Sequence, residues 1–215
     1  MRTRFRRALA ALAALAAAAA GAHDAASNAL STCFSADMER RIEGCSELIE
    51  SPHLDASTKS LAYAMRALAL SLKGTLEQAL PDYDMAIKLD PASAMALNNR
   101  AWVLYKLGRL SAAMTDVERA LTLAPTSAHA HDTRAHIHQA EGTHRSALRD
   151  YEQAMRYGGV HLVRLYQCGL EAQGLYKGPI DGLYTRDVRR ALEACVRSET
   201  CDPLPADEEC RAATS

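Results

Sequence analysis

Apolar and polar positions in the middle of the chain repeat with a period of 34 residues. Within 94–125, apolar residues recur at the three- and four-residue spacing of a helix. Gly108 then supplies a residue that can end a helix in the left-handed conformation, and a second apolar stripe follows over 110–123. Pro125 stops this second helix. The pattern predicts two antiparallel helices joined by a tight turn.

Seven columns of residues share this register. In one unit Arg100 lies eight residues before the turn glycine Gly108, and Asp116 lies eight residues after it. Residues at equal distance from the turn lie level in an antiparallel hairpin, so we expect Arg–Asp pairs, either within one hairpin or between neighbouring repeats. The columns are Arg66, Arg100 and Arg134; Asp82, Asp116 and Asp150; Gly74, Gly108 and Gly142; Ala67, Ala101 and Ala135; Ala79, Ala113 and Ala147; Ala86, Ala120 and Ala154; and Pro91 and Pro125.

These columns resemble the tetratricopeptide repeat family, which has 34 residues, small residues at helix contacts, a turn glycine and a closing proline. Residues 60–161 hold three copies, and Gly159 stands where the last copy would have its proline. The resemblance implies an all-α fold, a right-handed superhelix of antiparallel helical hairpins. It also implies an inner groove, lined mainly by the first helices, that binds peptides or protein segments.

The predicted groove face carries amide and aromatic side chains. Amides can pair with a peptide backbone as donor and acceptor together, and Trp102 is either a binding anchor or a side chain packed between helices. Because Lys106 is the only basic side chain predicted on this face, capture of a C-terminal carboxylate is not expected. The predicted groove residues are Asn98, Asn99, Trp102, Tyr105, Lys106, His129, Asp132, Thr133 and His136.

The start of the chain has the features of a secretory signal. Four arginines precede an uninterrupted Ala/Leu run over 8–20, and a small-x-small site follows it. We therefore predict that residues 1–22 are a signal peptide cleaved after Ala22, that the protein is periplasmic or secreted, and that it does not insert into a membrane afterwards. Cleavage would remove four of the 25 basic residues and none of the 26 acidic ones, leaving a net charge of −5, which argues against binding nucleic acid.

Six cysteines follow this segment, and an even number in an exported chain predicts disulfides. Cys33 and Cys45 lie 34 residues before Ala67 and Ala79. Residues 26–59 are therefore interpreted as a degenerate N-terminal hairpin. Its two cysteines would occupy the close-contact positions, where a disulfide can form.

Residues 162–215 depart from the repeat. A helix is expected at 160–173 and another at 186–197, with a turn-rich segment between them. This segment resembles the small helical peptidoglycan-binding-domain-like family, although Thr185 and Val188 replace the family Gly and Thr. The matching residues are Gly174, Tyr176, Gly178, Pro179, Asp181, Gly182 and Tyr184.

The resemblance implies a small module near the cell wall, with Gly178, Pro179, Asp181, Gly182 and Tyr184 in its turn. The Gly-Pro and Asp-Gly pairs are equally consistent with turn chemistry that binds nothing. Asp181 in particular is expected to cap its own turn rather than to act as a general base.

The four C-terminal cysteines allow three pairings. The favoured pairing joins Cys195 to Cys201 across a short turn and ties Cys210 to Cys168 on the helix 160–173. The competing pairing joins Cys168 to Cys195 and Cys201 to Cys210. Loop-closure entropy favours the first without excluding the second.

No catalytic motif is found, so we expect a non-enzymatic protein without a cofactor. The third repeat is rich in histidine, but no two of these residues have the three- or four-residue spacing with which a helix shares one metal ion, and no metal site is predicted. His131 and His138 replace apolar positions and are expected to be partly buried. The histidines are His129, His131, His136, His138 and His144.

The sequence thus predicts an exported scaffold that binds a protein or peptide partner in its repeat groove and lies near peptidoglycan. Two alternatives stay open. In the first, the protein binds a cell-wall ligand and the repeats are a spacer. In the second, it is a noncatalytic regulator of a wall-processing enzyme.

Overall fold

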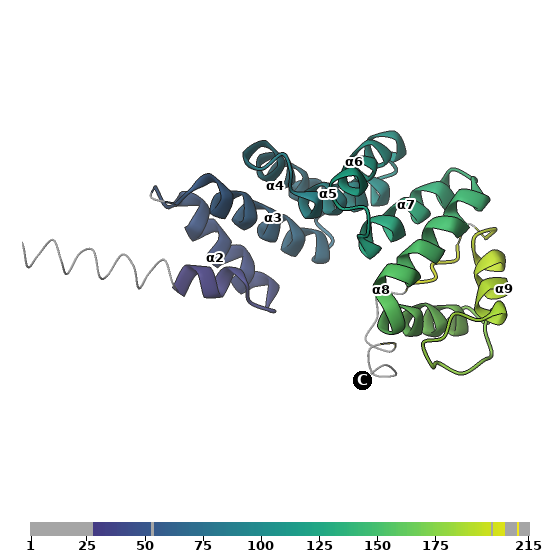
Figure 1. The fold of residues 1–215 in the computed structure, drawn as a ribbon. Coiled ribbons are helices and arrows are strands. Elements are labelled where there is room, and N and C mark those ends of the chain that lie inside the picture. Colours follow the sequence, from purple (N-terminus) through teal and green to yellow (C-terminus); the bar gives the residue numbers. More distant parts are fainter. Residues whose placement is uncertain (1–27, 53, 199, 205–209, 211–215) are drawn as a thin grey trace, which may run out of the picture. The chain divides into compact units, whose positions relative to one another are not determined.

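The computed structural model describes residues 28–52, 54–198, 200–204 and 210, and every regular element among them is helical (Figure 1). The predicted signal peptide, 1–22, lies outside the described residues. The chain divides into two compact units, one ending at Pro91 and the other beginning at Ala92. The helices are α2 (Met38–Glu50), α3 (Ala56–Leu72), α4 (Leu76–Leu89), α5 (Ala94–Lys106), α6 (Leu110–Leu123), α7 (Ala128–Ala140), α8 (His144–Ala172) and α9 (Arg186–Cys195).

The predicted hairpins are present, formed by α3 with α4, α5 with α6, and α7 with the first part of α8. Each turn has its glycine at positive φ, +82° at Gly74, +72° at Gly108 and +71° at Gly142, a conformation that costs glycine little. The facing alanines are fully buried in all three hairpins, as at Ala101 and Ala113. The small side chains let the paired helices approach closely.

The Arg–Asp columns form ion pairs within each hairpin, which confirms the first of the two predicted arrangements. Each arginine donates through Nε and Nη2 to both carboxylate oxygens of its aspartate, at 2.7–2.8 Å. This bidentate geometry is the strongest form of the interaction. The aspartates are buried and the arginines only partly exposed. The pairs are Arg66–Asp82, Arg100–Asp116 and Arg134–Asp150.

In the first unit, a short helix at 28–33 lies against α2, and the predicted disulfide Cys33–Cys45 joins the two. The Cα atoms of these cysteines are only 4.5 Å apart. Gly44 makes this approach possible, because a Cβ atom there would lie 2.6 Å from the backbone nitrogen of Cys33. The disulfide thus joins this helix pair covalently.

In the second unit, Gly159 adopts a left-handed backbone, with φ +66° and ψ −159°, and interrupts α8 where the repeat pattern ends. The second part of α8 packs with α9 (Figure 1). Their shared core includes Tyr166, Leu170, Val188 and Leu192, all fully buried.

The C-terminal cysteines pair as Cys168–Cys210 and Cys195–Cys201, which is the favoured of the two predicted arrangements. None of the described helices is both long and apolar enough to span a membrane.

Candidate functional site

Some of the predicted groove residues are accessible to solvent, and the others are buried. On α5, the side chains of Asn99, Trp102 and Tyr105 are half-buried and Lys106 is exposed, whereas Asn98 is buried. Of the predicted residues on α7, only His129 is exposed. The other predicted residues of that helix, Asp132, Thr133 and His136, are at most 7% exposed. Apart from His129, the part of the predicted groove that α7 supplies is therefore not free to contact a partner.

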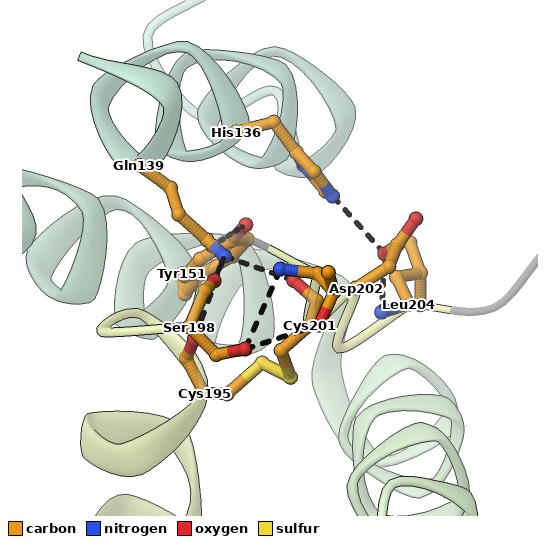
Figure 2. The surroundings of a disulfide bond; sticks show 9 residues. His136, Gln139, Tyr151, Cys195, Ser198, Cys201, Asp202 and Leu204 are labelled. Atoms are coloured by element: carbon orange, nitrogen blue, oxygen red, sulfur yellow. Dashed lines mark hydrogen bonds and ion pairs between the residues drawn. A yellow bond between two sulfur atoms is a disulfide. The ribbon is translucent and has the colours of Figure 1, made fainter. Parts of the chain in front are cut away.

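The segment after α9 covers the end of α7 that carries His136 and Gln139. After α9, the disulfide joins Cys195 to Cys201, six positions further along the chain, and Ser198 and Cys201 lie against α7 (Figure 2). The amide nitrogen of Gln139 donates to the main-chain carbonyls of Ser198 and Cys201, at 3.0 and 2.8 Å. The Tyr151 hydroxyl donates to the amide oxygen of Gln139 at 2.9 Å and so fixes the orientation of the amide. Gln139 thus binds main-chain carbonyls, as a groove amide would in a bound peptide.

His136 lies between two carboxylates at the centre of this contact. Its Nε2 is 3.1 Å from a carboxylate oxygen of Asp202, and its Nδ1 is 2.9 Å from the main-chain carbonyl of Asp132 (Figure 2 shows the first contact). Because both partners can only accept, both ring nitrogens donate, which is the charged imidazolium form. The buried Tyr166 hydroxyl donates to the Asp132 carboxylate.

The pKa values follow from this geometry. Burial alone would lower the pKa of His136, but the carboxylates of Asp132 and Asp202 outweigh it and raise this pKa to about 9. Burial raises the pKa of Asp132. Burial also acts to raise the pKa of Asp202, but its contact with His136 prevails and lowers this pKa. A buried positive charge thus fastens the C-terminal segment to the third repeat.

Aromatic rings surround His136. The ring of Trp102 meets it edge-on, with centroids 5.2 Å apart, and Tyr105 and Tyr151 lie at 5.7 and 5.3 Å. One part of Trp102 thus packs against neighbouring rings, as one of its two predicted roles requires, and the rest of the ring is accessible. The ammonium of Lys106 lies 5.3 Å from the centroid of the Trp102 ring, within the range of a cation–π contact.

An open hollow of about 620 Å³ remains beside the covered segment. One wall is formed by Tyr105 and Lys106 of α5 and another by His136 and Gln139 of α7. The loop after α9 completes it with Arg197, Thr200, Cys201 and Asp202, and His144 lies at its edge. The hollow therefore combines aromatic, amide and basic groups with exposed parts of the repeat face.

The module turn is organised around a buried side chain, Gln167 of α8. Its amide donates to the Asp181 carboxylate at 2.9 Å and accepts from the Gly182 N–H at 2.8 Å. Asp181 also accepts from the Leu183 N–H at 2.9 Å, which confirms that it caps its own turn. The hydrogen bond from Gln167 lowers the pKa of Asp181.

The other predicted turn residues are also held by local contacts. The Pro179 carbonyl accepts from the Tyr176 hydroxyl at 3.0 Å, and a Cβ atom at Gly178 would collide with that ring. Tyr184 is exposed and donates to Glu152 at 2.6 Å. A hollow of about 460 Å³, lined by Tyr176, Gly178 and Arg190 among others, lies beside this turn.

Two further histidines of the third repeat, His131 and His138, have structural contacts. His131 is buried, as expected, and bonds to the Asp150 carboxylate and the Pro125 carbonyl. His138 is half-buried, with its Nε2 atom 3.7 Å from Asp150. Over the residues that the structure describes, no three His, Cys, Asp or Glu side chains are grouped to hold a metal ion.

Three side chains that organise the site were missed at the sequence level, namely Gln139, Gln167 and Asp202. Gln139 follows the predicted groove residues His129, Asp132 and His136 at helical spacing, and this pattern could have placed it on the same face. Asp202 directly follows Cys201, but its contact with His136 spans 66 residues. No local pattern indicates such a contact.

We expect replacement of Gln139 with leucine to loosen the C-terminal loop selectively. The substitution removes the donor to Ser198 and Cys201 and leaves their carbonyls and the Tyr151 hydroxyl without this partner, at a cost of about 1–3 kcal/mol. Amide hydrogen exchange should accelerate by at least about ten-fold in 196–204. Exchange in α3 and α4 should stay unchanged. Equal acceleration in both units would contradict the role given to Gln139.

Comparison with known proteins agrees with this architecture. Two tetratricopeptide repeat family models match the chain, one over residues 61–93 and the other over 94–127. No curated protein matches the chain significantly in sequence. Residues 61–127 therefore match tetratricopeptide repeats, which supports a role in protein interaction.

Solved structures of MamA proteins share the fold. One, described as the crystal structure of MamA protein, matches with a TM-score of 0.56 and 19% identity over 80% of this chain and 90% of its own. MamA from Desulfovibrio magneticus RS-1 matches with a TM-score of 0.55 and 18% identity over 70% of this chain and 85% of its own. At these identities the likeness concerns the fold alone.

Proposed function

We propose that the protein is an exported, non-enzymatic scaffold that binds an extended segment of a partner protein along the open part of the repeat groove. The observation that carries this proposal is the row of side chains on α5 from Asn98 to Lys106. In the described part of the chain, the buried amide oxygen of Asn98 has no hydrogen-bond partner. This oxygen is closed to solvent, whereas Trp102 and Tyr105 offer partly exposed rings for a side chain of a bound segment.

Export is supported by the features of residues 1–22 and by the three disulfides, which persist in oxidising compartments. Mass spectrometry of the protein recovered from cells tests this part of the proposal. A mature chain beginning at His23 is expected. A chain that retains Met1 would exclude cleavage of the predicted signal peptide.

The binding proposal is tested by selecting a displayed library of random peptides against the mature protein. We expect a family of related peptides whose affinity falls at least about ten-fold in Trp102→Ala, because such anchors carry a large share of the binding energy. Leu123→Ala is the matched control, since Leu123 is an exposed apolar residue elsewhere on the second unit. If no peptide is selected, or if both variants bind equally well, the groove proposal is wrong.

Association with peptidoglycan is a second candidate function, favoured by the hollow of about 460 Å³ beside the module turn. Lys177 lines it and can engage a carboxylate, whereas Arg190 is paired with Asp187 of the same hollow. Sedimentation with purified peptidoglycan tests this function. The protein should sediment with the polymer, and Lys177→Glu should reduce the bound fraction. A protein that remains in the supernatant would exclude this function.

A further inference from the structure

A second hollow adjoins the one beside the groove. It has a volume of about 740 Å³ and lies between the first part of α8 and α9. His144 and Arg197 line both hollows. An extended ligand can therefore pass from Tyr105 and Lys106, along these two shared residues, into the second hollow.

Arginine side chains give the second hollow positive charge. Arg145, Arg149 and Arg197 line it and are exposed. Among the described residues, none of these three arginines makes an ion pair within 4.0 Å. Arg149 donates only to the Ser146 hydroxyl, at 3.2 Å. These guanidinium groups are available to a ligand.

The two acidic residues of the same hollow are already engaged. Arg189 lies 3.0 Å from Glu193 and 3.6 Å from Glu152. Glu152 also accepts from the Tyr184 hydroxyl at 2.6 Å. Among the described residues, the charge presented to a ligand is therefore mainly that of these three arginines. Lys106, His144 and the Asp202 carboxylate, which is paired with His136, lie further along the path. This local excess of positive charge contrasts with the whole chain, which has 25 basic and 26 acidic residues.

We propose that the partner segment is acidic and that it runs from the aromatic side chains of α5 into this arginine-lined hollow. The inference rests on the proposed peptide-binding function and adds the chemistry of the partner. A guanidinium group binds a carboxylate through two parallel hydrogen bonds, so several Asp or Glu side chains in sequence fit this path. Arg197, which follows the disulfide cysteine Cys195, brings the C-terminal loop into the binding surface.

The test uses the peptides selected from the random library. We expect them to be enriched in Asp and Glu beside an aromatic or apolar residue, and to bind more weakly as salt rises. The double variant Arg145→Gln/Arg149→Gln should weaken their binding at least about ten-fold. The matched control is Arg156→Gln, because Arg156 is an exposed arginine of the same helix outside both hollows.

The outcomes separate this inference from the function on which it rests. Peptides without acidic residues, or acidic ones that bind the double variant as tightly as the wild type, would overturn the inference. If those peptides still lost affinity in Trp102→Ala, the groove proposal would stand. In a third outcome, the double variant no longer sediments with peptidoglycan but still binds the peptides as tightly as the wild type. This result would assign the arginines to the wall polymer and would also overturn the inference. Circular dichroism of the variants confirms that each is folded.

Discussion

Replacing His136 with leucine lowers the free energy of unfolding of the second unit by about 3–5 kcal/mol, because it leaves buried carboxylate charge without its partner. His136 is 4% exposed and bonds to Asp202, while the Asp132 carboxylate beside it is almost as buried. Denaturation by urea, followed by circular dichroism, measures the loss. His161→Leu is the control, since His161 is exposed on α8. A loss below 1 kcal/mol would contradict the assignment of a buried charge.

The same contact makes stability depend on pH in a defined window. The pKa of His136 is raised from 6.5 to about 9, so its contribution is complete below pH 6.5 and disappears as the pH rises to about 9. Over this window the wild type should lose about 3 kcal/mol that His136→Leu does not lose. Urea denaturation of both proteins at pH 6 and pH 9 measures the difference. Parallel losses in the two proteins would show that other groups dominate.

Removing the disulfide Cys168–Cys210 lowers the free energy of unfolding by about 4 kcal/mol in the chain-entropy model, because its cysteines are 42 residues apart in sequence. In the test variant, alanine replaces both cysteines, so that the two buried positions keep small apolar side chains. The disulfide Cys195–Cys201 stays in place. Thermal and urea denaturation measure the loss.

A second double variant, Cys33→Ala/Cys45→Ala, provides the comparison. Its cysteines are 12 residues apart, so the same model predicts about 3 kcal/mol, and they belong to the first unit. Hydrogen exchange should therefore accelerate in 28–50 for this variant and in α8 and α9 for the other. Acceleration in the same segments for both variants would contradict independent roles for the two disulfides.

The repeats were predictable because their information is local. Glycine at the turns, facing alanines and equal distances from the turn were sufficient to predict the hairpins and the pairs such as Arg100–Asp116. The same register placed Cys33 and Cys45 in contact. Each of these contacts joins residues of one hairpin, where sequence distance determines spatial distance.

The covered groove was not predictable in this way. Helical spacing identified the face of α7 that carries Asp132 and His136, but it gave no information on what lies against that face. The groove amide Gln139 contacts Ser198, which is 59 residues away. Such a contact depends on how the chain turns back after α9 and on the length of the Cys195–Cys201 loop.

The Arg–Asp pairs have a consequence for how such a chain can change over evolution. Both members of each pair belong to the same 34-residue unit, as Arg100 and Asp116 do. A gene duplication or deletion that adds or removes one whole unit would therefore leave every buried aspartate with its arginine. A rearrangement that cuts a unit between its two helices would instead leave one charge buried alone. The internal pairing thus favours growth and shortening of the array in whole repeats.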